Sequence, residues 1–301
     1  MDPVNPRVAV TGATGLLGGA VATALAAAGV AQRLLVRSPD RAPALPGAEI
    51  AVAGYADGEA VRAALSGVDT VFMVSGAEEP DRLAAHRTFI DAAVAAEVHR
   101  IVYTSFLGAA PDATFTLARD HWHTEQHIRA SGPAFTFLRD NFYADQFLLF
   151  AGDDGILLGP GGDGRVSAVA RRDVADVAVA VLLAAVAGSP TSSLSGSLSG
   201  SLSGSPHDGR TYDLTGPEAL GLTDVARIIT EVTGRPVQYR PQTRAQAYES
   251  RSAYGAADWQ VEAWVSTYTA IAAGELSAVS GDVELVTGHP ATGLAALLAA
   301  R

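Results

Sequence analysis

Near its start the chain reads Thr11-Gly12-Ala13-Thr14-Gly15-Leu16-Leu17-Gly18, a glycine-rich stretch between the apolar run 8–10 and a helix-like segment that begins near Ala20. A strand, a glycine turn and a helix in this order form the phosphate-binding corner of dinucleotide-binding folds. We expect Gly12 to allow the tight turn, Gly15 to let a pyrophosphate approach bare backbone, and Gly18 to let the helix pack against the strand. The phosphates would lie at the helix N-terminus, where unpaired N–H groups and the helix dipole favour negative charge.

The second strand-like run, 34–36, ends in Arg37. NAD-binding folds place Asp or Glu near this point to bind the ribose 2′-hydroxyl, whereas an arginine accommodates the 2′-phosphate of NADP. A planar guanidinium group meets phosphate oxygens in a bidentate way. Arg37 therefore favours NADP over NAD. A solvated arginine at a strand end would look the same, and Asp40 nearby leaves an NAD-type acid as the alternative.

Composition limits the classes of function. The 301 residues suit one α/β domain with an accessory lobe, and 48% of them are apolar, enough for a sizeable core. The net charge of −11 argues against a nucleic-acid partner. We see no export peptide and no apolar run of membrane-spanning length, so we expect a cytoplasmic protein without a membrane partner. The chain contains no cysteine and no lysine, which excludes thiolate chemistry, disulfides and any mechanism that needs a lysine amine.

Strand-like and helix-like segments alternate through the first half of the chain. We predict strands at 7–10, 33–36, 49–53, 70–74, 100–104 and 134–138, with helices at 16–28, 58–66, 81–97 and 119–131. This βαβα order predicts an α/β fold, a Rossmann-like doubly wound parallel sheet with a smaller C-terminal α/β substrate lobe. In the lobe we expect a strand at 211–214 and helices at 223–233, 243–253, 258–273 and from about 291.

A repeat interrupts this pattern between 189 and 205. The tetrad Ser193-Leu194-Ser195-Gly196 recurs at 197–200 and again at 201–204. Such a Ser/Gly repeat buries too little surface to offset its ordering entropy, so we predict a flexible loop without a function of its own. We accordingly expect an NAD(P)-binding domain at 1–188, this loop at 189–205 and a substrate-binding lobe at 206–301.

A series of motifs extends over almost the whole chain outside the repeat. These are Thr11–Gly18, Val36-Arg37, Tyr103-Thr104-Ser105, His121-Trp122-His123-Thr124-Glu125, Ser131-Gly132-Pro133-Ala134-Phe135-Thr136-Phe137-Leu138-Arg139 and Gly288-His289-Pro290-Ala291-Thr292. In their order and spacing they resemble the NmrA-like group of atypical short-chain dehydrogenase/reductases. The likeness is closest to its bacterial NAD(P)H:quinone reductases and triphenylmethane reductases.

The resemblance implies cofactor contacts by position. The turn from Gly12 through Leu17 would hold the pyrophosphate, and Arg37 the adenosine phosphate. The ribose and nicotinamide side would be lined by residues that follow the fourth and sixth strands and by one arginine from the lobe, namely Ser75, Gly76, Ala77, Asp140, Asn141, Phe142, Tyr143 and Arg171. The chain departs from the family near the end of the third strand, where relatives often carry an acid and this sequence has Gly54-Tyr55-Ala56. That departure leaves the adenine-side contact open.

The chain lacks the acid used by most short-chain dehydrogenases, a tyrosine followed four positions later by lysine. Tyr103 is followed at that spacing by Leu107, and Tyr143 by Phe147. A plain ketone needs a proton as hydride arrives, whereas a quinone or cationic dye gains a delocalised product that needs little acid help. We therefore predict an NADPH-dependent reductase of quinone-like or other electron-poor conjugated acceptors.

The family position of His121 makes it the first candidate for a proton donor, since histidine titrates near neutral pH. Thr104 and Ser105 are candidates for hydrogen bonds to a carbonyl oxygen, and Tyr143 for lining the site. The alternative roles are structural, because a histidine can pack a helix and strand-end hydroxyls often bond to backbone groups.

Two other functions are weighed against this one. The NmrA-like group also contains non-catalytic NAD(P)-binding redox sensors, which the missing tyrosine–lysine pair would fit equally well. A metal site is disfavoured, because His123 and His127 share a helix face but Glu125 is one place late for the metalloprotease motif. We therefore expect no bound metal ion. For the oligomeric state, we expect a homodimer.

Overall fold

The computed structural model describes residues 7–187 and 204–300, which form two compact units, each discontinuous in sequence. Among these residues, unit 1 comprises 7–104, 124–138, 175–187 and 204–212, and unit 2 comprises 105–123, 139–174 and 213–300. Apart from its last two residues, the loop predicted at 189–205 lies outside the described residues. The assignment of a nucleotide-binding and a substrate-binding role to separate domains stays a prediction.

A seven-stranded sheet is built in the order β3-β2-β1-β4-β5-β6-β9. Its strands are β1 (Val8–Thr11), β2 (Gln32–Val36), β3 (Ala48–Val52), β4 (Thr70–Met73), β5 (Arg100–Phe106), β6 (Ala134–Asp140) and β9 (Arg210–Leu214). The pairs β1–β2, β1–β4, β2–β3 and β4–β5 are parallel. The six strands predicted for this sheet are present, within about two residues at each end, and the Rossmann-like fold is confirmed. The seventh strand, β9, is the one predicted at 211–214 for the C-terminal lobe; it lies instead at the edge of this sheet, next to β6.

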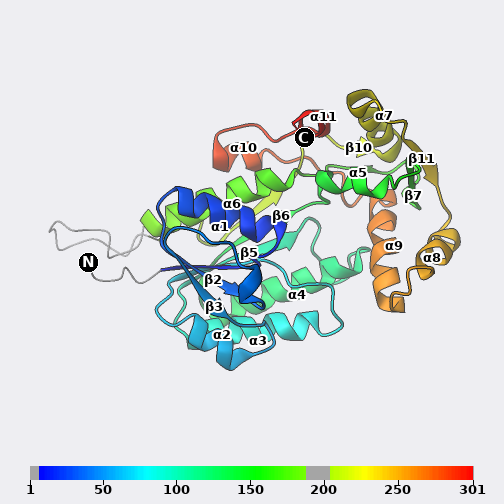
Figure 1. Ribbon diagram of the computed structural model, residues 1–301. Helices are drawn as coiled ribbons and strands as arrows, with labels where there is room; N and C mark the ends of the chain where they lie inside the picture. The colour runs from blue at the N-terminus through cyan, green and yellow to red at the C-terminus, as the bar shows by residue number, and fades with distance from the viewer. Residues whose placement is uncertain (1–6, 188–203, 301) are drawn as a thin grey trace. The chain divides into compact units, whose positions relative to one another are not determined.

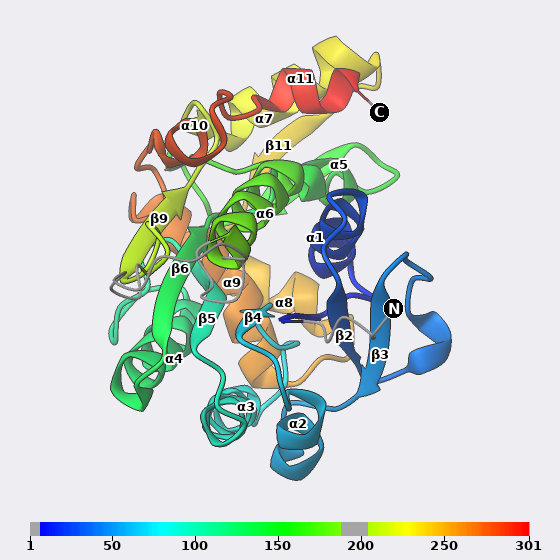
Figure 2. The same cartoon turned by 90° about the vertical axis from the view of Figure 1, so that its left-hand side faces the viewer.

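Helices cover both faces of the sheet in unit 1. The first half of the chain contributes α1 (Leu16–Ala27), α2 (Gly58–Ala64), α3 (Arg82–Ala95) and α4 (Thr116–Ser131), and α6 (Arg171–Ala187) follows later. Figures 1 and 2 show α1 on one face, with α2 and α3 on the other. Because both faces are covered, β1 and β4 are buried along their whole length, as expected of central parallel strands. The core between the sheet and α3 includes Phe89, Ile90, Ile101, Tyr103 and Phe137.

Unit 2 has a core of its own, built on short strands and helices. Its strands pair as β7 (Ile156–Gly159) with β11 (Gln238–Pro241), parallel, and β8 (Arg165–Val166) with β10 (Leu220–Gly221), antiparallel. Its helices include α5 (Phe147–Phe150), α7 (Leu222–Thr233), α8 (Arg244–Ser252), α9 (Asp258–Ala272), α10 (Asp282–Thr287) and α11 (Leu294–Ala299). The predicted helices correspond to α7, α8, α9 and α11, whereas α5, α10 and the four short strands were not predicted, and neither was α6. Such strands are too short for a periodic pattern, and their partners lie far away in sequence.

In the described part of the chain, none of the helices combines the length and apolarity that crossing a membrane requires.

Candidate functional site

The glycine corner has the geometry that its sequence predicts. Gly12 follows β1 with φ of +64°, a left-handed conformation that strains any side chain. Its carbonyl accepts a hydrogen bond from the Gly15 N–H at 2.8 Å, and α1 begins at the next residue. A Cβ at Gly18 would lie 2.4 Å from the Gly12 oxygen, so the helix can pack this close to the strand end only without a side chain there. The turn and close-packing roles of Gly12 and Gly18 are therefore confirmed.

Gly15 has a different environment. As the N-cap of α1 it has φ of −98° and ψ of 175°, which an L-residue adopts without strain, and it supplies no side-chain cap. A Cβ at Gly15 would have only the Gly12 oxygen within 4 Å, at 3.3 Å. A side chain at this position would require the Gly12 oxygen to shift by a few tenths of an ångström, a much smaller change than at Gly18. An unhindered backbone beside a helix N-terminus is what the close approach of a pyrophosphate needs.

Arg37 lies directly after β2, with 71% of its side chain exposed. Its guanidinium group is 3.4 Å from the Glu79 carboxylate, which is 59% exposed. An exposed ion pair of this kind contributes little stability. The geometry therefore leaves the Arg37 side chain accessible to a phosphate, and its preference for NADP over NAD stays a prediction.

Tyr55 occupies the region where relatives often carry an acid. Its hydroxyl donates to the Val74 carbonyl at 2.6 Å and lies 2.5 Å from the Thr11 hydroxyl. Burial raises the pKa of Tyr55, so the phenol stays protonated. Tyr55 thus connects the ends of β1 and β4 through polar contacts, a role that its position in the sequence does not reveal.

Thr104 is buried near the end of β5. Its hydroxyl oxygen accepts a hydrogen bond from the Ser75 N–H at 2.7 Å. The same hydroxyl donates to the Met73 carbonyl oxygen at 3.5 Å. This arrangement matches the structural alternative, in which a strand-end hydroxyl satisfies backbone groups. Thr104 and Ser75, both predicted site residues, are thereby brought together in unit 1.

Gly76 and Ala77 also belong to unit 1, whereas the predicted site residues from Ser105 onward belong to unit 2. Ser105 is buried, and His121, on α4, has 6% of its surface exposed with its ring centroid 6.1 Å from that of Phe106. Whether His121 donates a proton stays a prediction.

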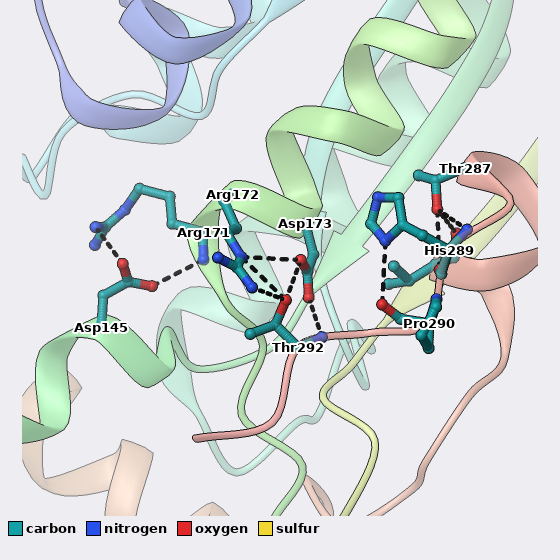
Figure 3. A network of polar contacts seen from close by, with 9 residues as sticks. Asp145, Arg171, Arg172, Asp173, Thr287, His289, Pro290 and Thr292 are labelled. Atoms are coloured by element: carbon teal, nitrogen blue, oxygen red, sulfur yellow. Dashed lines mark hydrogen bonds and ion pairs between the residues drawn. The ribbon is translucent and has the colours of Figure 1, made fainter. Parts of the chain in front are cut away.

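Asp140, the last residue of β6, and Tyr143, three positions later, form a close pair. The Tyr143 hydroxyl donates to the Asp140 carboxylate, and the Arg171 guanidinium carbon lies 4.7 Å from the centroid of the Tyr143 ring. Burial and the neighbouring Asp140 charge raise the pKa of Tyr143, so its proton remains on the phenol and points to a carboxylate. Asp145 completes the group: its carboxylate accepts from the Arg171 N–H at 2.8 Å and lies 3.5 Å from the guanidinium group (Figure 3). Three predicted site residues are therefore assembled around one aromatic ring.

Asn141 is a buried connector. Its side-chain amide donates to the Ser167 carbonyl at 3.2 Å, the Ser167 hydroxyl at 2.9 Å and the Leu276 carbonyl at 3.0 Å, while its carbonyl oxygen accepts from the Phe142 N–H at 2.8 Å. The Phe142 ring stacks on Phe147 with centroids 5.2 Å apart. Both side chains thus shape the segment after β6 by internal contacts.

The start of α6 is tied to the Gly288–Thr292 motif, as Figure 3 shows. The buried Asp173 carboxylate accepts from the Thr292 N–H at 2.6 Å and from the Thr292 hydroxyl at 2.8 Å. Arg172 donates to the same hydroxyl at 3.0 Å. Arg171, a predicted cofactor residue, directly precedes Arg172. The motif therefore anchors the helical turn from which the Arg171 side chain extends. Sequence analysis missed Asp173, whose acidic side chain in a first helical turn is an ordinary helix feature.

Metal-binding residues do not cluster within 7–187 and 204–300: nowhere there do three His, Asp or Glu side chains gather as a metal site would need. His127, one of the two histidines considered above, lies 2.7 Å from Asp91 as a hydrogen-bonded pair.

Comparisons with known proteins agree with this fold. A family profile described as NAD(P)H-binding matches residues 12–185. Quinone oxidoreductase 2 of Escherichia coli (strain K12) is 32% identical over 96% of this chain and 96% of its own length. Among solved structures, NADPH-dependent quinone oxidoreductase from Escherichia coli in complex with NADPH superposes with a TM-score of 0.83 at 30% identity, covering 97% of this chain and 99% of that one. Triphenylmethane reductase of Citrobacter sp. in complex with NADP(H) gives a TM-score of 0.80 at 27% identity, covering 97% and 98%.

Proposed function

This chain belongs to the NAD(P)H-binding family, and from this premise we propose that it is an NADPH-dependent reductase of quinone-like or other electron-poor conjugated acceptors. The observation that carries the proposal is the corner at Gly12–Gly18, where a left-handed turn and a close-packed helix leave the Gly15 backbone open. Two of the relatives that share the fold over nearly the whole chain are named as reductases of quinones and of triphenylmethane dyes.

The residues fit a bound nicotinamide coenzyme. We assign the pyrophosphate to the backbone of Gly12–Leu17 and the 2′-phosphate to Arg37. We assign the ribose and nicotinamide side to the segments 75–77 and 140–143 and to Arg171. NADPH bound there would supply a hydride, that is, two electrons with one proton.

The side chains present favour an acceptor that needs no strong acid. No lysine exists in the chain, so no tyrosine–lysine pair can form. The Tyr143 hydroxyl already donates its proton to Asp140, and the pKa of Tyr143 is raised. A quinone that takes up hydride becomes a delocalised hydroquinone monoanion, which gains its remaining proton from water or from a histidine such as His121. The proposal thus matches the acceptor to the weak acids available.

The decisive assay mixes purified protein with NADPH and a panel of quinones and triphenylmethane dyes, with a simple ketone as the control. Loss of reduced-nicotinamide absorbance with the conjugated acceptors and not with the ketone is the expected result. Comparable rates with ketone and quinone would contradict the proposed acceptor class. Tight NADPH binding without turnover on any acceptor would favour the redox-sensor alternative.

The coenzyme preference has its own test. Arg37→Ala should lower the affinity for NADPH more than that for NADH, because only NADPH carries the 2′-phosphate. The loss should be about tenfold or more, the range of a charge-assisted hydrogen bond. An unchanged ratio of the two affinities would show that Arg37 does not discriminate.

We further propose a cytoplasmic location and a homodimeric state, both carried from the sequence and from the frequency of twofold dimers among soluble proteins. Cell fractionation and light scattering of the purified protein test them separately.

A further inference from the structure

We propose that His86 is a positioning residue that holds the loop Val74–Gly76 in place for the coenzyme. The inference rests on the proposed function, since the loop contains Ser75 and Gly76, which we assign to the ribose and nicotinamide side. His86 lies outside all of the sequence motifs described above. His86, the loop and the side chains that contact them all belong to unit 1.

The loop lies beside the glycine corner. It directly follows β4, which pairs in parallel with β1, the strand that leads into Gly12. A Cβ built on Gly12 would lie 3.2 Å from the Cβ of Val74. In doubly wound sheets, ligands bind outside the carboxyl ends of the strands, which is where this loop emerges.

Side chains hold the loop backbone on both sides. Val74 N–H donates to the Thr11 hydroxyl at 2.9 Å, and the Val74 carbonyl accepts from Tyr55 at 2.6 Å. Ser75 N–H donates to Thr104 at 2.7 Å. Gly76 N–H donates to His86 Nε2 at 2.8 Å, and the Gly76 carbonyl accepts from Arg82 Nε at 3.0 Å. Three consecutive residues without regular secondary structure thus have their backbone groups bonded to five different side chains.

The bond from Gly76 determines the protonation of His86. A ring nitrogen that accepts an N–H bond carries no proton, so Nε2 is unprotonated and the proton of the neutral ring lies on Nδ1. That nitrogen is 2.9 Å from the Thr124 hydroxyl, which serves as its acceptor. The ring is fully buried, and burial, reinforced by the Arg82 charge, lowers the pKa of His86 to about 3. His86 is therefore neutral, in one tautomer, at any ordinary pH.

Thr124 extends this arrangement to α4. It is buried, and its side chain also hydrogen bonds with Tyr103. The edges of the Tyr55 and Tyr103 rings pack against His86, with centroids 6.0 and 5.9 Å from its own. The threonine in the His121–Glu125 motif is thus explained as the residue that orients His86.

Gly76 itself shows how tightly the loop is held. A Cβ at this position would lie 3.0 Å from His86 Nε2 and 3.4 Å from Cδ2. A side chain at 76 would therefore push either the loop or the imidazole away, and the N–H bond would lengthen. We conclude that His86 and Gly76 are matched, and that the loop is ordered before the coenzyme arrives. Preorganisation of this kind raises affinity by reducing the ordering that binding must supply.

Two substitutions of His86 separate its two contacts. His86→Gln can place its amide oxygen near the position of Nε2 and keep an acceptor for Gly76 N–H. His86→Asn reaches only the position of Nδ1, so it keeps the Thr124 contact and loses the Gly76 contact. His99→Asn, at a histidine whose side chain is 77% exposed, is the matched control. NADPH dissociation constants, thermal melting and hydrogen exchange of the Gly76 amide are measured for each full-length protein.

We expect His86→Asn to weaken NADPH binding about tenfold, the effect of one hydrogen bond lost at a buried donor, and to expose the Gly76 amide to exchange. His86→Gln should recover most of the affinity and the protection. Equal dissociation constants for the wild type and the Asn variant, or equal losses in both His86 variants, would overturn the inference.

The wild-type protein provides a test that no variant can spoil by misfolding. Its ¹⁵N spectrum should show an unprotonated Nε2 on His86, together with slow exchange at Gly76. A protonated Nε2 or a fast-exchanging Gly76 amide would refute the role of His86. If the wild type has these features but binds no nicotinamide coenzyme, the proposed function fails instead.

Discussion

Alanine substitutions at Gly15 and Gly18 should separate coenzyme binding from folding. Both residues belong to one short corner, yet their surroundings differ. Gly15 has an unstrained backbone with φ of −98° and one neighbour, the Gly12 oxygen, 3.3 Å from a built Cβ. At Gly18 the same Cβ would lie 2.4 Å from the Gly12 oxygen and 2.6 Å from the Thr11 oxygen.

The expected magnitudes follow from these contacts. Gly15→Ala reduces the entropy of the unfolded chain, which stabilises by about 0.4–1 kcal/mol where the native conformation suits alanine. The 3.3 Å contact offsets part of this gain, so we expect the free energy of unfolding to change by less than about 1 kcal/mol. Gly18→Ala must displace helix α1 from the strand end, and overpacking of this kind costs about 1–3 kcal/mol or more.

Coenzyme affinity should change in the opposite order. A methyl group on Gly15 would occupy the space that we assign to the pyrophosphate and remove one or two charge-assisted hydrogen bonds. Each contributes about 1.5–3 kcal/mol, so the NADPH dissociation constant should rise about 10- to 100-fold or more. Gly15→Ala should therefore be a folded protein that binds coenzyme poorly.

Urea denaturation gives the free energy of unfolding, and titration with NADPH gives the dissociation constant of each variant under the same conditions. Gly281→Ala is a matched control, because Gly281 is also an N-cap glycine, with φ of −93°, and a Cβ there would have no atom within 4 Å. A Gly15→Ala variant that binds NADPH as tightly as the wild type would refute the pyrophosphate assignment. A Gly18→Ala variant as stable as the wild type would refute the close packing of helix and strand.

Three further predictions concern other parts of the molecule. Asp173→Asn should lower the free energy of unfolding by about 3 kcal/mol in urea denaturation, because it removes a buried charge that accepts two hydrogen bonds from Thr292. Thr292→Val loses only the hydroxyl and should lower the free energy of unfolding by about 1 kcal/mol. Equal losses in the two variants would contradict the role of the charge. His86 has a pKa of about 3 in the folded protein, below its ordinary value of 6.5, so the unfolded chain binds one more proton than the folded protein between these two pH values. The contribution of neutral His86 to the free energy of unfolding is therefore complete above pH 6.5 and is lost as the pH falls towards 3. The wild type should then lose up to about 1.4 kcal/mol per pH unit more than His86→Gln between pH 6 and 4, and parallel acid profiles would refute a neutral buried His86. Deletion of residues 193–200, two of the Ser/Gly tetrads, should leave the turnover rate unchanged and the free energy of unfolding within about 1 kcal/mol of the wild type. The reason is that the chain after the repeat is anchored by the Arg100–Asp208 ion pair at 2.6 Å. Loss of turnover would reveal a function for the repeat.

Most of the fold, and the family, could be predicted from local sequence patterns. The strands of the sheet are predictable because apolar runs of β-prone residues alternate with helical patterns, and buried parallel strands need such runs. The NAD(P)H-binding family and the Rossmann-like sheet are confirmed by the fold and the comparisons, and the choice of NADPH over NADH stays a prediction. The short strands of unit 2, α5 and α10 were not predicted, since segments of two to six residues show too little of a repeating pattern, and the 17-residue helix α6 was not predicted either.

The candidate site divides along the same line. The sequence by itself determined the glycine corner, because the positive φ of Gly12 and the close packing at Gly18 both arise within the short segment 11–18. Only the tertiary structure decided which atoms the polar side chains bond. Thr104 meets Ser75 across 29 positions, Asn141 meets Leu276 across 135, and His86 meets Thr124 across 38. Hydrogen bonds act over about 3 Å, so partners this far apart along the chain are paired only when the fold brings them together.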